Sequence, residues 1–243
     1  MSNATLDLIH RHGSVRNYKP DPVPQAMIQA IVAAAQRSST SSNLQMMSVV
    51  AVTDAAKRKR LAALCGNQAH IAQAPIFLAW CADLNRLDRA CQLRGYTQVA
   101  GYVENFVLAA VDTAIASQTG ALAAESLGLG ICYIGSIRNN PKDVIALLDL
   151  PRLVFPVTGM SVGWPAKPPA LRPRLDIQAV LHWETYDRAM IATGIYEGRQ
   201  VPAPGKPEVV EDYGWLEHSA RRVSQPTRTF LRQVLADQGF ELK

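Results

Sequence analysis

The sequence predicts a folded protein of mixed helices and strands, organised around one long, buried helix. Nearly half of its 243 residues are hydrophobic, which is enough for a sizeable core in one large domain or two small ones. Apolar residues recur at helical spacing from residue 103 to residue 115, and alanine on the other faces indicates burial on several sides. Short apolar runs before and after this helix are typical of buried strands.

The other elements follow from local patterns along the chain. Gly128 and Gly130 end the central helix, because glycine is typical of helix C-termini. The charged segment 83–94 is expected to be a mobile or lid-like connection. Besides the central helix, we expect helices in a short piece that ends near Ile9, from about Pro24 to Gln36, at 55–64, at about 141–148, and in one terminal helix that contains Trp215 to Leu235. We expect strands at 48–53, 75–81 and 131–134, and in the glycine-containing run near 159–163.

Composition narrows the class of protein. The N-terminus lacks the basic and apolar regions of a signal peptide, and acidic residues such as Asp112 interrupt the longest apolar segment, so we expect a cytoplasmic protein without a membrane span. The four cysteines form no CxxC pair and no zinc spacing, which favours free thiols. The net charge is +5, but the sequence has no basic run interleaved with aromatic residues of the kind that binds nucleic acid. An anionic small molecule explains the charge equally well, and we expect no nucleic-acid partner.

Several local motifs leave alternatives open. His10 and His12 suit a metal, but no third ligand is apparent, so the segment is either a solvated connector or a set of donors to a phosphate or flavin edge. The hydroxyl run 38–45 is a flexible loop, a helix cap or the lining of a polyol site. Arg172 and Arg174 approach one anion only if the backbone turns, and are otherwise exposed.

Two familiar motifs are excluded. The pattern Gly159-x-Ser161-x-Gly163 matches a hydrolase nucleophile elbow, but Trp164-Pro165 forbids the helix that such an elbow needs. Gly128-Leu-Gly130 fails the dinucleotide-binding fingerprint because Tyr133 stands at the third glycine, and no Walker loop is present.

Taken together, several blocks closely resemble the oxygen-insensitive nitroreductase and flavin reductase family, in its larger, typically NADPH-using branch. The similarity runs in unbroken order from about Leu6 to His182, and the tail matches loosely. The blocks are His12-Gly-Ser-Val-Arg16, 38–45, Gly66-Asn-Gln68, Glu125-Ser-Leu-Gly-Leu-Gly130, Tyr133-Ile-Gly-Ser-Ile-Arg-Asn139, Gly163-Trp-Pro165 and Arg172-Pro-Arg-Leu175.

The resemblance implies an α+β fold with a central, mostly antiparallel sheet flanked by helices. It also implies a homodimer with FMN at the subunit interface and the long helix at the dimer core. Residues 1–184 would form the FMN-binding domain. Residues 185–243 would be an extension that packs on the dimer, because too little chain follows the Pro/Gly-rich stretch for an independent core.

The resemblance also assigns site residues. The residues that resemble family positions at the FMN phosphate and its nearby edge are His12, Gly13, Ser14, Arg16, Arg172 and Arg174. Ser39, Thr40 and Ser41 match the polar run beside the flavin, and Gln68 matches the amide that meets the ring. The loop that passes the reactive N5 is matched by Tyr133, Ile134, Gly135 and Ser136, and the substrate and NADPH positions are matched by Asn43 and Arg199. Four positions depart from the family: Gly13 replaces a frequent arginine, Arg172 a usual lysine, Ser136 a glycine and Asn43 an aromatic residue.

The implied activity is a ping-pong transfer of two electrons from NADPH or NADH, through FMN, to nitroaromatics, quinones or similar acceptors. The flavin carries the chemistry, so no catalytic acid, base, nucleophile or metal is expected from the chain. The alternatives are a flavin reductase that supplies reduced flavin, and a flavin-binding sensor without turnover.

Overall fold

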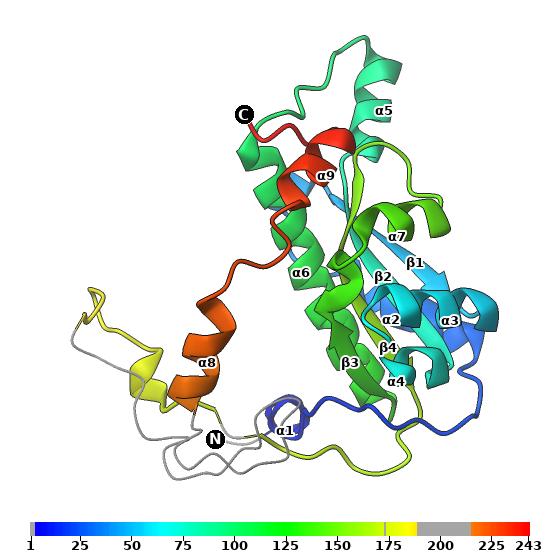
Figure 1. Cartoon of the computed structure of the whole chain (residues 1–243), viewed down its shortest axis with the longest axis vertical. Coiled ribbons are helices and arrows are strands. Elements are labelled where there is room, and N and C mark those ends of the chain that lie inside the picture. The colour runs from blue at the N-terminus through cyan, green and yellow to red at the C-terminus, as the bar shows by residue number, and fades with distance from the viewer. Residues whose placement is uncertain (1–2, 173, 189–214) are drawn as a thin grey trace. The chain divides into compact units, whose positions relative to one another are not determined.

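The computed structural model describes residues 3–172, 174–188 and 215–243, and the chain divides into two compact units. The first unit consists of residues 1–170 and 230–243, and the second of residues 171–229. The boundary expected at residue 184 therefore lies within the second unit, and the last residues of the expected extension belong to the first. The sheet, the long helix and most of the expected site residues are in the first unit (Figure 1).

A four-stranded antiparallel sheet forms the centre of the first unit. Its strands lie in the order β1 (Met47–Val52), β2 (Ile76–Asp83), β4 (Val154–Gly163) and β3 (Gly130–Ile134). The register places Val49 opposite Trp80, and Tyr133 opposite Met160. The expected α+β architecture with a mostly antiparallel sheet is confirmed, with β1 and β3 at its two edges.

The helices of the first unit surround this sheet. They are α1 (Ala4–His10), α2 (Gln25–Ala35), α3 (Ala55–Leu64), α4 (Ala69–Gln73), α5 (Asn85–Arg94), α6 (Val103–Ser126), α7 (Pro141–Leu147), α9 (Leu231–Asp237) and the single 3₁₀ turns η1 (Ser41–Asn43) and η2 (Gly135–Arg138). The second unit contributes η3 (Ile177–Ala179) and α8 (Trp215–Val223).

Two sequence-based expectations were wrong. The charged segment 83–94 is the end of β2 followed by helix α5, because Leu87, Ala90 and Cys91 recur at helical spacing and Gly95 ends the helix with φ of 77°. The single terminal helix is two helices, α8 and α9, because Pro226 interrupts the helical pattern between them.

Helices cover both faces of the sheet. On one face, α2 and α6 pack against a buried cluster that includes Trp80 and Met160. Gly120 permits this contact, since a Cβ there would lie 2.8 Å from the Trp80 ring. On the other face, α3, α4 and α7 cover a cluster that includes Phe77 and Cys132. The central helix of the sequence is therefore a core helix.

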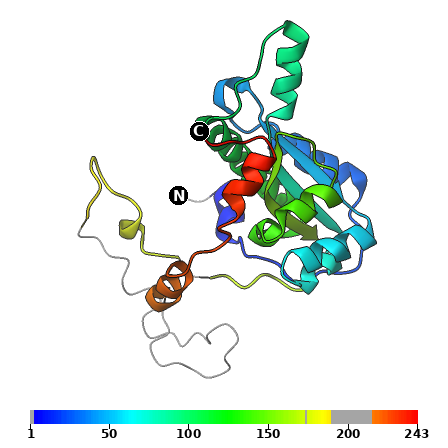
Figure 2. The ribbon, with the colours of Figure 1, turned by 45° about the horizontal axis from the view of Figure 1, so that its top comes forward.

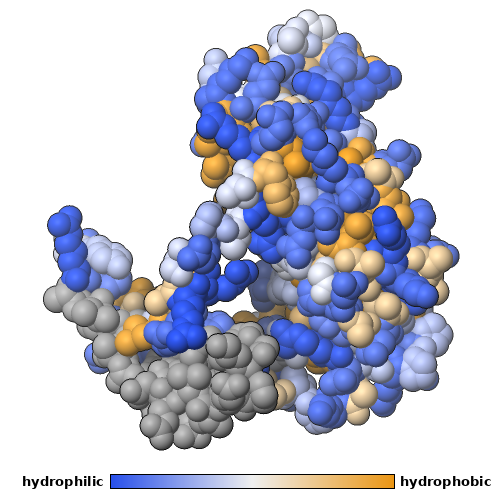
Figure 3. Space-filling view, in the orientation of Figure 1, coloured by the Kyte–Doolittle hydropathy of each residue, from blue (hydrophilic) through white to orange (hydrophobic). Residues whose placement is uncertain are grey.

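One side of α6 is nevertheless exposed and apolar. By length and composition α6 is the helix of the described chain that could span a membrane, but its other side packs on the sheet and α2. Val103, Val107, Val111 and Ile115 are each between 42% and 49% exposed and follow one another at four-residue spacing. We call these four residues the α6 stripe. Figure 3 shows further apolar areas on the visible face of the first unit.

Residues 230–243 return to the first unit and close it at the start of α6. Phe240 is fully buried, and its ring meets the ring of Phe106 edge-on with centroids 5.3 Å apart. The backbone amide of Lys243 donates to the carbonyl of Gly101 at 2.8 Å. Figures 1 and 2 both show this C-terminal segment beside the beginning of α6.

Candidate functional site

An extended segment, residues 12–18, runs along the free edge of β3, and we call it the strap. The amide of Val15 donates to the carbonyl of Ile131 at 2.8 Å, and Tyr18 forms a bridge with Pro165. The hydroxyl of Tyr18 also donates to the carbonyls of Val15 and Ser161, at 2.6 and 3.2 Å. The strap is thus fixed to two strands of the sheet.

Alternation along the strap divides its side chains between two sides. Val15 is buried on the inner side, whereas Ser14 and Arg16 are exposed and His12 is partly exposed. The expected phosphate donors His12, Ser14 and Arg16 therefore share one side of an extended backbone. This arrangement lets all three approach one anionic ligand.

Gly13 faces the inner side and fits a crowded position. A Cβ at Gly13 would lie 2.8 Å from Cβ of Pro169 and 3.0 Å from the carbonyl oxygen of Ala170. An arginine here would require Pro169 to move, which explains why this chain has glycine at a position expected to be basic.

Arg16 carries a positive charge that no carboxylate of the described chain balances within ion-pair distance. Its charge acts on the groups beneath the strap. Burial, and secondarily Arg16, lower the pKa of His70 on α4, so this imidazole is held neutral. Burial raises the pKa of the Cys132 thiol, and Arg16 opposes that rise. The unbalanced guanidinium suits an anionic ligand.

Gln68 and Ser136 meet at the end of β3. Gln68 precedes α4 and follows a turn in which Gly66 has φ of 82°. Its amide nitrogen donates to the Ser136 hydroxyl at 2.5 Å and to the carbonyl of Cys65 at 2.8 Å. Ser136, at a position where the resemblance leads us to expect glycine, therefore fixes the side chain of Gln68, and the amide oxygen of Gln68 remains to accept from a ligand.

The loop from Tyr133 to Ser136 is anchored to α6. The Tyr133 hydroxyl donates to Gln118 at 3.3 Å and lies 3.4 Å from the Ser117 hydroxyl. Burial raises the pKa of Tyr133, so it stays protonated. Ile134 is buried, and Gly135 begins η2. The loop is therefore held by Gln68, which precedes α4, and by α6.

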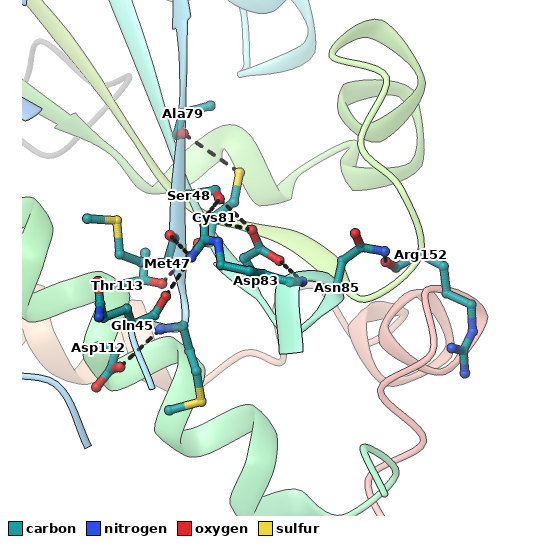
Figure 4. A network of polar contacts seen from close by, with 12 residues as sticks. Gln45, Met47, Ser48, Ala79, Cys81, Asp83, Asn85, Asp112, Thr113 and Arg152 are labelled. Carbon is teal, nitrogen blue, oxygen red and sulfur yellow. Dashed lines mark hydrogen bonds and ion pairs between the residues drawn. The ribbon is translucent and has the colours of Figure 1, made fainter. Parts of the chain in front are cut away.

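The polar run Ser39 to Ser41 is part of the serine loop, residues 38–45, which Asp112 of α6 holds in place. The Thr40 hydroxyl donates to Asp112 at 2.5 Å, and the amides of Ser41 and Met46 donate to the same carboxylate at 3.1 and 3.3 Å. Asp112 is almost fully buried. Figure 4 shows Asp112 reaching from α6 toward the chain that precedes β1.

The backbone of the serine loop explains Asn43. Its φ is 55°, in the left-handed region where asparagine is tolerated far better than bulky residues. Beside the loop lies a cleft of about 470 Å³. It is lined by residues of α2, the serine loop, β1, α5 and α6, including Ser39, Thr40, Met47, Arg86, Asp112 and Ala116.

One copy of the first unit does not bring the strap and the serine loop together. The strap lies at the β3 edge of the sheet, whereas the serine loop precedes β1 at the opposite edge. Helix α6 also separates them, since Asp112 holds the serine loop and Glu125 contacts His12 of the strap. These carboxylates are 13 positions apart, or about 20 Å along the helix.

Sequence reasoning missed the roles of Asp112 and Glu125. Asp112 orders the serine loop, and Glu125 accepts a 2.6 Å hydrogen bond from Nδ1 of His12. The available signal was the presence of carboxylates inside an otherwise apolar helix, because such groups are buried only with partners.

Three of the expected site residues lie outside the first unit. In the second unit, Nη1 of Arg174 donates to the carbonyl of Arg172 at 3.0 Å. Arg199 lies outside the described residues. Among the described residues no group of three histidine, cysteine or acidic side chains is placed to hold a metal, and His12 is engaged by Glu125.

A known protein family matches most of the first unit. The sequence model of the Nitroreductase family matches residues 9–164. The chain belongs to the nitroreductase family. The model of the family's C-terminal domain matches residues 172–243, a range that contains Arg172 and Arg174.

Individual members of the nitroreductase family match over the full length of the chain. An oxygen-insensitive NADPH nitroreductase of Salmonella typhimurium is 38% identical over 239 residues, which cover 97% of this chain and 98% of that protein. A Bacillus subtilis FMN reductase using NAD(P)H is 35% identical over 247 residues, 99% of each chain. The solved structure of B. megaterium NfrA2 superposes with a TM-score of 0.91 at 35% identity, covering all of both chains.

Proposed function

We propose that this chain is an FMN-dependent NAD(P)H oxidoreductase, and that two copies pair to build each flavin site. Relatives named as an NADPH nitroreductase and an FMN reductase support the cofactor and the electron donor. The observation that carries the proposal is the outer side of the strap, where His12, Ser14 and the unbalanced Arg16 are presented together. Nitroaromatics, quinones and related acceptors in the cytoplasm complete the proposed reaction.

The described residues fit FMN. Its phosphate is an anion that charge-assisted donors bind well, and the strap offers an imidazole, a hydroxyl and a guanidinium on one side. Gln68 offers an amide oxygen to a ring N–H, since its nitrogen is already engaged by Ser136. FMN, when bound, supplies hydride acceptance and two-electron transfer. The chain binds, orients and shields the ring.

Pairing of two copies explains the separation of strap and serine loop. The α6 stripe is apolar and exposed, and Ile115, its last residue, lies between Asp112, which holds the serine loop, and Glu125, which contacts the strap. An apolar helix face of this kind is typical of an interface. A two-fold axis that crosses α6 midway between Asp112 and Glu125, about one turn beyond Ile115, exchanges the ends of the two helices, so the serine loop of one copy approaches the strap of the other. Each pair then has two equivalent sites.

The first experiment is an absorbance spectrum of the purified protein with FMN, recorded before and after NADPH is added without oxygen. Oxidised flavin bands that bleach on addition support the proposal. Arg16→Ala is expected to weaken FMN retention at least tenfold, since it removes the unbalanced cation. Lys57→Ala, an exposed lysine on α3, is the matched control and should bind FMN as the parent does. A parent protein that neither binds FMN nor oxidises NADPH would refute the proposal.

A second experiment tests pairing. Ile115→Asp places a charge in the α6 stripe and is expected to shift the protein to a single copy in light scattering, with loss of FMN. Leu93→Asp, a 70% exposed leucine at the end of α5, is the control and should leave the assembly unchanged. Unchanged assembly in Ile115→Asp would argue against the stripe as the interface.

The B. subtilis relative named as an FMN reductase favours a second function, in which free flavin is the acceptor. Steady-state turnover of free FMN and of a nitroaromatic at equal concentration separates the two. Faster turnover of free FMN would identify a supplier of reduced flavin.

A further inference from the structure

The position of Glu125 is unusual for a carboxylate. It lies in the last turn of α6, where the helix presents partial negative charge and disfavours an acidic residue. Its side chain is only 11% exposed, and its Oε2 is buried without a hydrogen-bond partner among the described residues. Neither helix stability nor packing accounts for this arrangement.

The partner of Glu125 is His12, across 113 residues of sequence. Nδ1 of His12 and Oε1 of Glu125 are 2.6 Å apart, a short, charge-assisted contact. A carboxylate on one ring nitrogen keeps a proton there, fixes the ring orientation and directs the other nitrogen away from itself. Nε2 is therefore the nitrogen available to a ligand, on the partly exposed ring of His12.

We propose that Glu125 is a positioning residue that holds His12 for the phosphate of the flavin, so that the chain selects FMN over riboflavin. The inference rests on the proposed function and adds a residue to it. A carboxylate, an imidazole and a phosphate would then lie in series, with Nδ1 of the ring toward Glu125 and Nε2 toward the phosphate. Glu125 acts through His12 and does not touch the flavin.

The test compares FMN with riboflavin, which has the same ring and ribityl chain but no phosphate. Flavin-free parent, Glu125→Gln, Glu125→Ala, His12→Ala and the double variant Glu125→Gln/His12→Ala are titrated with each flavin. Glu125→Gln is expected to weaken FMN binding by about tenfold or more and to change riboflavin binding by less than about twofold. Glu104→Gln, the exposed first-turn glutamate of the same helix, should bind both flavins as the parent does.

Two further readouts separate positioning from a general loss of structure. In the His12→Ala background, Glu125→Gln should have no additional effect on FMN, because the two residues act as one unit. Long-range ¹H–¹⁵N NMR of the flavin-free protein should show the His12 proton on Nδ1 in the parent, and a mixture of ring tautomers in Glu125→Ala.

An unchanged preference for FMN in Glu125→Gln and Glu125→Ala would overturn the inference and leave the proposed function standing. Equal loss of both flavins, or additive effects of Glu125→Gln and His12→Ala, would also overturn it. A parent protein that binds neither flavin would remove the proposed function, and this inference with it.

Discussion

Mixing two inactive variants tests whether each flavin site is built from two copies of the chain. Arg16→Ala removes the unbalanced guanidinium from the strap. Ser39→Trp fills the cleft of about 470 Å³ beside the serine loop. In a pair of identical chains, either change damages both sites, so each variant alone is expected to be almost inactive.

The structure sets the size of the expected recovery. Random exchange of chains makes about half of all pairs mixed, and in a mixed pair one site takes its strap and its serine loop from the two unaltered copies of those segments. One of two sites in half of the pairs gives about a quarter of the parental activity. The other site of each mixed pair carries both defects.

NADPH oxidation with a quinone or nitroaromatic measures the recovery after the variants are unfolded together and refolded. The matched control mixes Arg16→Ala with Gln68→Ala. Both residues lie on the strap side of a site, so each site of a mixed pair has lost either Arg16 or Gln68. The control should stay at the level of the separate variants. Recovery in neither mixture would refute a site shared between the strap of one copy and the serine loop of another.

Other predictions concern the stability and chemistry of the first unit. Phe240→Ala should lower the free energy of unfolding by about 3–5 kcal/mol in chemical denaturation, because the ring is fully buried, whereas Leu242→Ala at a half-buried neighbour should cost less. The pKa of His70 is lowered by burial and by Arg16, so the unfolded chain takes up that proton first as the pH falls below about 6.5. His70→Gln should therefore flatten the decline of the unfolding free energy from about pH 7 to pH 5, and an unaltered slope would contradict the burial argument. Cys91, the one cysteine of the described chain that is not buried, should react fast with a thiol reagent, and Cys91→Ser should abolish that fast phase.

Local patterns predicted most elements because local interactions form them. The basic helix at 55–64 has the expected bounds, since the Asp54 carboxylate accepts from the amide of Lys57 and begins it. The segment 83–94 was misinterpreted because five of its twelve residues are charged, although Leu87 and Cys91 already repeat at helical spacing. Charge alone does not distinguish an exposed helix from a loop.

The site was less accessible to sequence reasoning because its supporting contacts are remote in sequence. The resemblance named the residues of the strap and the serine loop, and their roles toward the flavin stay predictions. No local pattern places Glu125 on His12 or Asp112 on Thr40, because these partners are 113 and 72 residues apart. The sequence also does not indicate that the strap and the serine loop lie at opposite edges of the sheet.

The return of residues 230–243 to the first unit has a consequence for protein synthesis. Residues 1–170 leave the ribosome first and can form the sheet, but Phe106 has no Phe240 to pack against until the whole second unit has been translated. Apolar surface at the start of α6 therefore stays uncovered throughout that interval. A premature stop codon anywhere in 171–229 would damage the sheet-containing unit as well as the extension, and heat-shock chaperones are expected to engage such nascent chains at this end of α6.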